Sequence, residues 1–192
     1  MTSDRSTHQL RKLSRFLSLL LRHRPARFPL QLDAQGYAAL DEVMYFVRGL
    51  PNFRWATYTD IDAVLTLPGR KRFERVEQED GPTLIRALYG HTAVRPTYEP
   101  VKPPPTLYHG TAPETMPAIT RDGLRPMERQ YVHLTVDPET ARRTGLRHTS
   151  QPVILKVAAA EAHDAGIPFY HPVTEIYLCD HVPPAYVVTH NP

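Results

Sequence analysis

Five short segments of this 192-residue chain carry arginine, histidine and hydroxyl side chains of the kind that bind phosphate groups. In the first, Arg22-His23 follows an apolar run, so a guanidinium could clamp a phosphate while the imidazole moves a proton. In the second, Lys71-Arg72-Phe73, strand alternation places an outward Arg72 beside an inward Phe73. Taken singly, each has an ordinary explanation, because cations stabilise helix C-termini and charged strand ends are usually solvated.

The third and fourth segments place histidines next to glycine and hydroxyl residues. Gly90-His91-Thr92 can form a turn that directs a backbone N–H, an imidazole and a hydroxyl at one anion. His109-Gly110 lies in the predicted strand LYHGT, where glycine would let a ligand approach the backbone closely. Alone, each of these segments is equally well explained as a loop or a strand end.

The fifth segment, MERQYVHLT, places Arg129 shortly before a predicted strand that carries Tyr131 and His133 on one face. None of the remaining histidines has the His-x-x-x-His spacing of a metal site. The chain also has a single cysteine, so we expect no metal site and no internal disulfide. The remaining histidines are His8, His148, His163, His171, His181 and His190.

Three helices and a hairpin are predicted to position the first three segments. Leucines at helical spacing predict a first helix that ends near residues 22–24, because Pro25 disfavours helical geometry in the residue before it. A second helix should bury Leu40, Val43, Met44 and Val47. A third should begin near Thr59, with Thr59 or Asp60 as its N-cap. KRFERV and TLIRAL then predict a β-hairpin closed by EDGP. This order is that of a winged helix.

A proline-rich segment divides the chain. Five prolines fall within residues 96–105, which predicts an extended connector between an N-terminal lobe, residues 1–95, and a C-terminal lobe, residues 106–192. The C-terminal lobe should alternate short strands with helices. One helix should run over residues 112–122 and close at Gly123, and another should begin with Asp137 as its cap and end near Gly145. The apolar runs PVILKVA, EIYLCD and AYVV should supply three further strands. It has no G-x-G-x-x-G fingerprint and no P-loop motif.

Charge and composition narrow the class of protein. The first 98 residues hold 15 Lys/Arg against 10 Asp/Glu, and the remainder hold 8 against 10, so an anionic partner is expected for the basic half. An apolar content of 41% excludes disorder throughout, and the absence of a long apolar stretch excludes a membrane span. The N-terminus lacks a signal pattern. We expect a soluble, reduced, cytoplasmic protein.

Taken in order, the five segments resemble the RNA 2′-phosphotransferases of the KptA type over nearly the whole chain. The matching motifs are LSRFLSLLLRHRP at 13–25, RF at 72–73, GHT at 90–92, HGT at 109–111 and MERQYVHLT at 127–135. The chain departs from the family by carrying threonine for serine at two of these motifs and Gln-Tyr in place of Asn-His in the last one. The two threonines keep the hydroxyl.

The resemblance implies an α+β protein with an N-terminal winged-helix, RNA-binding lobe and a C-terminal ADP-ribosyltransferase-like lobe that binds NAD. By the same resemblance, an internal 2′-phosphate of a tRNA-like RNA, as formed in tRNA splicing, is transferred to NAD through an ADP-ribosylated RNA intermediate. The products are RNA 2′-hydroxyl, ADP-ribose 1″,2″-cyclic phosphate and nicotinamide. We expect the chain to act as a monomer, with NAD as co-substrate and no membrane partner.

The resemblance also implies roles for individual residues. The catalytic set is Arg22, His23, Arg72 and Arg129. The NAD-binding set is His109, Gly110, Thr111, Tyr131, His133 and Thr135. The set that binds the RNA phosphate is Arg22, Arg72, Gly90, His91 and Thr92.

Two other functions remain compatible with the sequence. A related transferase could leave ADP-ribose on a terminal phosphate of a nucleic acid or on a small molecule, and analysis of the product would distinguish it. A winged-helix regulator that binds DNA is the alternative from a different class. Its recognition helix would be TYTDIDAVLTL, which has no arginine or lysine, whereas such helices normally carry some.

Overall fold

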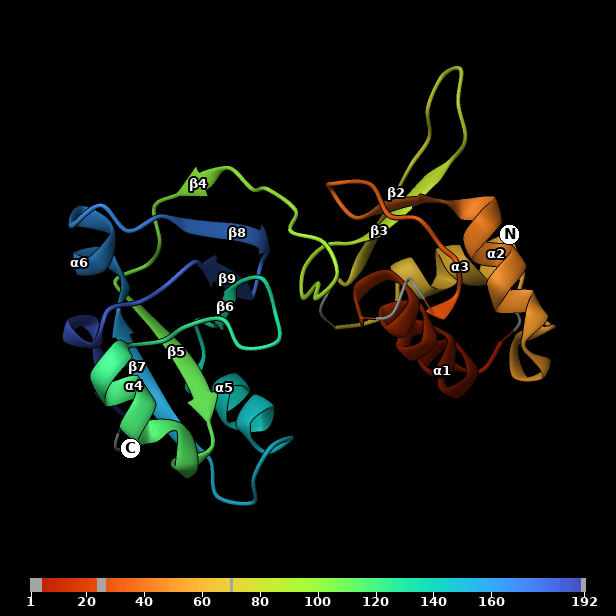
Figure 1. Ribbon diagram of the computed structural model, residues 1–192. Coiled ribbons are helices and arrows are strands. Elements are labelled where there is room, and N and C mark those ends of the chain that lie inside the picture. The colour runs from red at the N-terminus through yellow and green to blue at the C-terminus, as the bar shows by residue number, and fades with distance from the viewer. Residues whose placement is uncertain (1–4, 24–26, 70, 191–192) are drawn as a thin grey trace. The chain divides into compact units, whose positions relative to one another are not determined.

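The computed structural model describes residues 5–23, 27–69 and 71–190 of the chain, which is a mixed α/β protein with small antiparallel sheets. Its contacts divide it into two compact units, Met1–Thr97 and Tyr98–Pro192. We call them the N-terminal unit and the C-terminal unit (Figure 1). In the described ranges no helix is both long and apolar enough to cross a membrane.

The first helix of the N-terminal unit is amphipathic and continues beyond its regular part. Helix α1, Thr7–Ser18, starts with a capping box in which the Ser6 hydroxyl accepts from the Gln9 backbone and the Gln9 side chain accepts from the Ser6 backbone. A turn of π-helix, η1, then spans Leu19–His23. The predicted helix is confirmed as far as His23, and the predicted end at Arg24 lies outside the described residues.

Two further helices follow in the predicted order. Helix α2, Leu40–Gly49, is followed by the 3-10 turn η3, Pro51–Phe53, and by helix α3, Tyr58–Leu65. The predicted N-cap of α3 was wrong. The cap is Thr57, whose hydroxyl accepts from the Asp60 backbone while the Asp60 carboxylate accepts from the Thr57 backbone.

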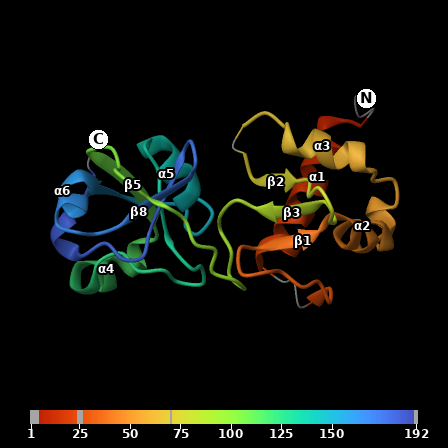
Figure 2. The same ribbon diagram turned by 90° about the horizontal axis from the view of Figure 1, so that it is seen from above.

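A three-stranded antiparallel sheet completes the N-terminal unit (Figure 2). The predicted hairpin is confirmed as β2, Phe73–Val76, paired with β3, Leu84–Ala87, so that Phe73 lies opposite Ala87. The sheet also contains β1, Tyr37–Ala39, on the other edge of β3. That strand was not predicted, since three residues give too short a pattern to read.

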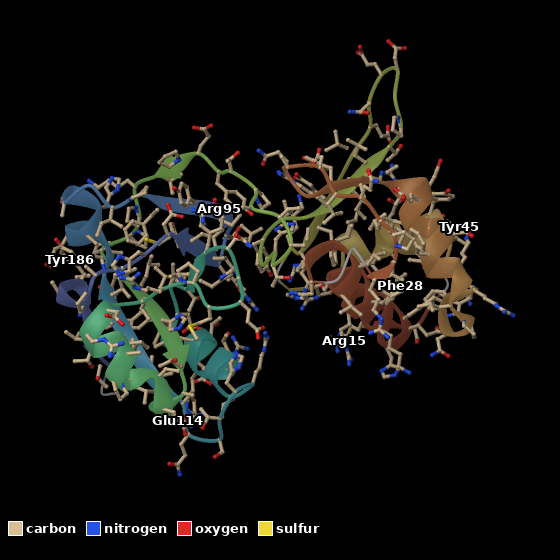
Figure 3. The ribbon with its side chains drawn as sticks, viewed as in Figure 1. Arg15, Phe28, Tyr45, Arg95, Glu114 and Tyr186 are labelled. Carbon is tan, nitrogen blue, oxygen red and sulfur yellow. The ribbon has the colours of Figure 1, made fainter. Side chains whose placement is uncertain are left out.

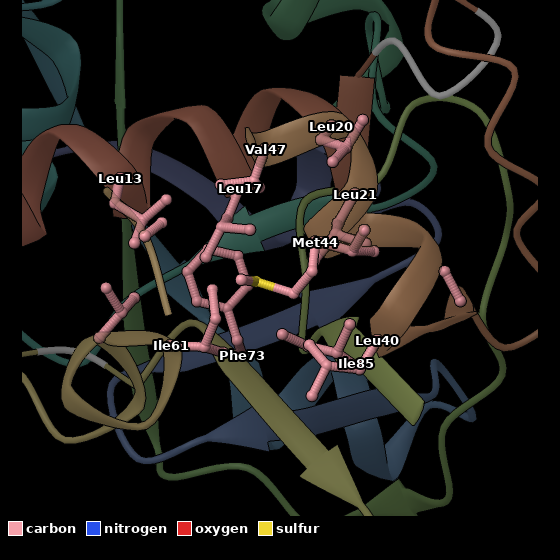
Figure 4. Packing of buried hydrophobic residues seen from close by; sticks show 14 of the residues in the cluster. Leu13, Leu17, Leu20, Leu21, Leu40, Met44, Val47, Ile61, Phe73 and Ile85 are labelled. Atoms are coloured by element: carbon pink, nitrogen blue, oxygen red, sulfur yellow. The ribbon is translucent and has the colours of Figure 1, made fainter. Parts of the chain in front are cut away.

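One apolar core joins the three helices to this sheet. Leu13 and Leu17 of α1 pack with Met44 of α2, Ile61 of α3 and Phe73 of β2, and all five are almost completely buried (Figure 4). Burial of such side chains contributes about 1.5–3 kcal/mol each. The core therefore fixes the C-terminal end of α1 and η1 against the start of β2.

The C-terminal unit contains two antiparallel sheets. The first has the strand order β10-β7-β5, from Val187–Thr189, Val153–Ala158 and Thr106–Thr111. The second has the order β4-β8-β9-β6, from Pro100–Val101, Phe169–Val173, Ile176–Cys179 and Val132–Leu134. Strands β4 and β8 were not predicted, and β10 begins later than the predicted AYVV run.

A backbone bridge links the two sheets of this unit. Tyr108 of β5 and Thr135, just after β6, exchange two backbone hydrogen bonds of 2.7 and 2.9 Å. Beyond this bridge each strand pairs within its own sheet, β5 with β7 and β6 with β9. The bridge therefore brings the segments around His109 and His133 together.

Short helices connect the strands of the C-terminal unit. The predicted helix over residues 112–122 is a 3-10 turn, η4, followed by α4, and it ends at Gly123 with φ +76°, as predicted for a glycine cap. The predicted cap at Asp137 is confirmed at the start of α5. These elements are η4, Pro113–Thr115; α4, Met116–Asp122; α5, Pro138–Gly145; α6, Ala159–Asp164; and η5, Pro184–Tyr186.

Candidate functional site

Arg22 is the most constrained of the predicted site residues in the N-terminal unit. It lies on the η1 turn, and only 9% of its surface is exposed. Its guanidinium carbon is 4.6 Å from the ring centre of Tyr89 and 5.6 Å from that of Phe73, distances at which cation–π attraction operates. The two rings hold the planar guanidinium in one orientation, as a bidentate anion ligand requires.

Arg72 lies next to Arg22, fifty residues further along the chain. An Nη2–H of Arg22 donates to the backbone carbonyl of Arg72 at 3.3 Å, and Nη1 of Arg72 donates to Ser14 Oγ at 3.4 Å. Arg72 is exposed and Phe73 is buried, as the predicted strand alternation requires. The structure thus brings two of the predicted arginines together at the end of the first helix.

Thr92 ties the loop after β3 to the same helix end. Its backbone N–H donates to the Arg22 carbonyl at 2.9 Å. Its hydroxyl donates to the carbonyls of Arg22 and His23 at 3.1 and 3.3 Å. These carbonyls at the helix C-terminus would otherwise need other partners. Thr92 therefore positions Arg22 and the exposed His23, and its hydroxyl proton is directed at the helix carbonyls.

His91 lies inside the unit rather than on its surface. Only 2% of it is exposed, and neither ring nitrogen has a hydrogen-bond partner among the described residues. Its ring packs on Gly36, which has φ +81° and where a Cβ would lie 2.6 Å from Nε2. Burial, followed by the charges of Arg22 and Arg86, lowers the pKa of His91 to about 4. The imidazole is therefore neutral at pH 7 and contributes no positive charge to a phosphate site.

This buried imidazole predicts a loss of stability in acid. Well above pH 6.5 His91 is neutral in the folded and unfolded states. As the pH falls from 6.5 to about 4, only the unfolded chain binds the proton, so the free energy of unfolding decreases by about 3 kcal/mol. Urea denaturation at pH 7 and pH 4.5 should show a smaller decrease for His91→Gln than for the wild type. His8→Gln, at an exposed histidine, is the control and should behave like the wild type. Equal decreases in His91→Gln and wild type would contradict this assignment.

In the C-terminal unit, His109 is oriented by the backbone of the neighbouring sheet. Its Nδ1 lies 2.9 Å from the His133 carbonyl. Because a carbonyl only accepts, Nδ1 carries the proton and Nε2 remains an acceptor. Burial lowers the pKa of His109, the hydrogen bond to His133 opposes this shift, and the charges of Arg129 and His148 add to it. The exposed Arg129 is therefore close enough to His109 to act on its charge.

Thr135 provides a second polar group near this histidine. It follows β6 and forms the backbone bridge to Tyr108. Its side chain is only 6% exposed, and its hydroxyl has no hydrogen-bond partner among the described residues. A buried hydroxyl without a partner is costly in a folded protein, and a bound polar ligand is one way to satisfy it.

Thr111 and Tyr131 have clear packing roles. The Thr115 hydroxyl donates to the Ala112 carbonyl at 2.7 Å, so the Thr111 hydroxyl is the donor in its 2.7 Å contact with Thr115. Tyr131 was predicted to share a strand face with His133, and this was wrong because β6 begins at Val132. Its ring is buried against Tyr98 and Tyr170, with ring centres 5.6 and 5.5 Å away.

Gly110 allows β5 to lie directly on helix α5. A Cβ at this position would be 2.0 Å from the carbonyl oxygen of Ala141 and 3.2 Å from the Gly145 nitrogen. Gly110 was predicted to let a ligand approach the strand closely. In the structure it is the backbone of helix α5 that approaches this closely. Strand β5, with His109, is thereby fixed against α5.

The substitution Gly110→Ala is accordingly expected to destabilise the protein by about 3 kcal/mol, because two backbone segments must separate to admit a methyl group. Urea denaturation followed by circular dichroism measures this effect. Gly49→Ala is the matched control, since a Cβ there meets nothing within 4 Å, and it should change stability little. If both variants unfold at the same urea concentration, the proposed packing is wrong.

The predicted residues therefore form two clusters, one in each unit. The first joins Arg22, His23, Arg72 and Thr92, and the second joins His109, Arg129, His133 and Thr135. Sequence reasoning missed Ser14 and Tyr89, which contact the arginines of the first cluster. Ser14 lies within the first motif and Tyr89 directly precedes the GHT motif, but neither residue type nor spacing indicated their contacts with the arginines. No group of three potential metal ligands occurs in the described ranges.

Comparison with known proteins agrees with the motifs in these clusters. Residues 8–181 match the family described as "RNA 2'-phosphotransferase, Tpt1 / KptA family". A protein of Trichormus variabilis named "Probable RNA 2'-phosphotransferase" is 40% identical over 179 residues, which cover 92% of this chain and 94% of the relative. Proteins with the same name from Acetivibrio thermocellus and Streptomyces griseus are 36% and 39% identical, over 92% of this chain and 94% and 95% of theirs.

Proposed function

The chain belongs to the Tpt1/KptA family of RNA 2′-phosphotransferases, and from this premise we propose that it transfers an internal RNA 2′-phosphate to NAD. The proposed products are RNA with a free 2′-hydroxyl, ADP-ribose 1″,2″-cyclic phosphate and nicotinamide. The proposed RNA is tRNA-like, and NAD is a co-substrate that is consumed.

We assign RNA binding to the N-terminal unit as a winged-helix lobe. Its element order, three helices interleaved with β1 and followed by the β2–β3 hairpin, supports this assignment. We assign NAD binding to the C-terminal unit as an ADP-ribosyltransferase-like lobe. This assignment is supported by the two antiparallel sheets of the unit, which are linked at the Tyr108–Thr135 bridge.

The first cluster suits the binding of a phosphate dianion. Arg22 lies against two aromatic rings, and the Arg72 guanidinium donates to Ser14 of the same helix, so both guanidinium groups have protein contacts that position them before a ligand arrives. Preorganised charge of this kind stabilises negative charge that develops on phosphate oxygens, because little reorganisation is needed during the reaction. Arginine also keeps its charge at any working pH.

The second cluster suits the ribose and amide groups of NAD. The Nδ1–H of His109 bonds to the His133 carbonyl, which orients Nε2 as an acceptor, and the Thr135 hydroxyl, without a partner among the described residues, lies on the neighbouring segment. Hydroxyl and amide groups of the dinucleotide can donate hydrogen bonds to Nε2 of His109 and can form hydrogen bonds with the Thr135 hydroxyl. Arg129, whose charge acts on His109, is assigned to the incoming phosphate.

The proposed reaction has two steps that balance without a protein nucleophile. In the first, a 2′-phosphate oxygen bonds to C1″ of the NAD ribose, and the bond from C1″ to nicotinamide breaks. In the second, the ribose 2″-hydroxyl attacks phosphorus, and the bond from phosphorus to the RNA 2′-oxygen breaks. The attacking 2″-hydroxyl loses one proton and the leaving 2′-oxygen gains one, so no net proton is consumed. His23, exposed at the end of η1, is assigned as the donor to the leaving oxygen.

The single observation that carries this proposal is the contact between Arg22 and Arg72, which unites two motifs fifty residues apart at one helix end. The test is incubation with an RNA oligonucleotide that has one internal 2′-phosphate, with and without NAD. We expect NAD-dependent loss of the phosphate, with a free 2′-hydroxyl in the product. A stable ADP-ribosyl adduct on the RNA would instead identify the related transferase, and loss without NAD would refute the proposal.

A further inference from the structure

A hollow on the N-terminal unit lies outside both clusters. It has a volume of about 470 Å³ and is formed by the N-terminal half of α1 together with η3 and the residues after it. Its wall combines two cations, two amides and two aromatic rings, a mixture typical of nucleotide-binding surfaces. The lining residues are Gln9, Lys12, Arg15, Asn52, Phe53 and Trp55.

The aromatic part of the hollow is held in place by its neighbours. The indole Nε1–H of Trp55 donates to the Asn52 carbonyl at 2.8 Å, and the Phe53 ring centre lies 6.2 Å away in an edge-on arrangement. Phe53 in turn stacks on Phe16 of α1 at 5.1 Å. The Arg5 guanidinium lies 5.0 Å from the Trp55 ring centre. Trp55 is only partly buried, so part of a rigidly held ring remains accessible.

The cationic part of the hollow is available for a ligand. Lys12 and Arg15 are exposed, and neither forms an ion pair with any residue in the described ranges. Helix α1, THQLRKLSRFLS, contains no acidic residue that could neutralise them. Arg15 extends from the α1 surface of the unit (Figure 3). The hollow therefore offers positive charge beside an aromatic face.

We propose that this hollow binds a single-stranded segment of the substrate RNA next to the nucleotide that carries the 2′-phosphate. Bases would stack on Trp55, phosphates would contact Lys12 and Arg15, and the amides of Gln9 and Asn52 would meet base edges. This inference rests on the proposed function, since it takes Arg22 as the ligand of the 2′-phosphate.

The position of the hollow along the first helix agrees with this role. Arg15 precedes Arg22 by seven residues on the continuous α1–η1 segment, which is at most about 10 Å along the axis, because the α-helical part rises 1.5 Å per residue and the wider π turn rises less. Three stacked nucleotides span about the same distance. One RNA strand can therefore reach both groups.

Trp55 is the only tryptophan of the chain, so its fluorescence reports on the hollow directly. The full chain is titrated, without NAD, with a single-stranded RNA octamer that has no 2′-phosphate. We expect the RNA to quench the fluorescence of Trp55. Arg15→Ala should bind the octamer about tenfold more weakly than wild type. In a plot of the logarithm of the association constant against the logarithm of the salt concentration, its slope should be smaller in magnitude by about 0.7. Arg11→Ala removes the same charge from the same helix outside the hollow, and its affinity should stay within about twofold of wild type.

If Arg15→Ala and Arg11→Ala weaken binding of the RNA octamer equally, the proposal is overturned, because the loss of affinity would then reflect only the net charge of the protein. Quenching by polyglutamate equal to that by the octamer would also overturn it, since the hollow would then not select RNA. In steady-state assays with a 2′-phosphorylated octamer, Arg15→Ala should raise KM about tenfold with a smaller change in kcat. If wild type binds the plain octamer but never removes a 2′-phosphate, the proposed function fails while the hollow remains an RNA site.

Discussion

Replacing Arg22 by lysine is expected to lower kcat/KM for removal of the RNA 2′-phosphate by about a hundredfold or more. Arg22 is 9% exposed, its guanidinium lies against the Tyr89 and Phe73 rings, and it donates to the Arg72 carbonyl. Lysine keeps the charge but loses the planar group that stacks on the rings and the paired N–H donors that bind a phosphate bidentately. The loss therefore measures geometry rather than charge.

The assay compares steady-state rates of Arg22→Lys and wild type with a 2′-phosphorylated RNA oligonucleotide and NAD. Arg11→Lys is the matched control, because Arg11 is exposed on the same helix and belongs to neither cluster. Thermal unfolding of both variants separates loss of activity from loss of folding. Arg22→Lys with at least one third of the wild-type kcat/KM would exclude Arg22 as a phosphate ligand in the reaction.

The second large effect is expected for His23→Ala, which should slow the second step by at least about a hundredfold. The leaving RNA 2′-oxygen would then lack its proton donor, while the first step, which releases nicotinamide, needs no proton from this residue. ADP-ribosylated RNA should accumulate as a result. His23 is exposed at the end of η1, so removal of its side chain should leave the core intact.

Mass spectrometry of the RNA during single-turnover reaction measures this accumulation. The intermediate should reach a large fraction of the RNA in His23→Ala and only a small fraction in wild type. His8→Ala, at an exposed histidine near the start of α1, is the control and should resemble wild type. If His23→Ala forms the final product at the wild-type rate with no adduct, another group donates the proton.

Local patterns predicted most helices and strands because their causes are local. The leucine spacing of α1, the Asp137 cap of α5 and the Gly123 end of α4 each depend on residues within one or two turns. The N-cap of α3 was misplaced because several neighbouring residues can cap a helix. The reciprocal hydrogen bonds between Thr57 and Asp60 make Thr57 the cap in the structure. Strand β1 is formed by pairing with β3, which a local pattern cannot show.

The sequence predicted which residues belong to the candidate site, but not how they are arranged in space. Motifs indicated Arg22 and Arg72, yet their contact depends on the packing of Phe73 beneath the first helix. The GHT turn looked equally suited to a surface ligand, whereas His91 is buried because Gly36, from a distant turn, leaves room for its ring. Gly110 is required by helix α5, which lies some thirty residues further on. Such contacts between distant segments carry no local signal.

The transfer of the phosphate itself is the most direct test of this account. An RNA oligonucleotide labelled with ³²P in its single internal 2′-phosphate is incubated with the purified full chain and NAD. The account predicts that all released label appears in an ADP-ribose cyclic phosphate, with one nicotinamide formed for each label transferred. Label released as inorganic phosphate, or lost at the same rate without NAD, would contradict it.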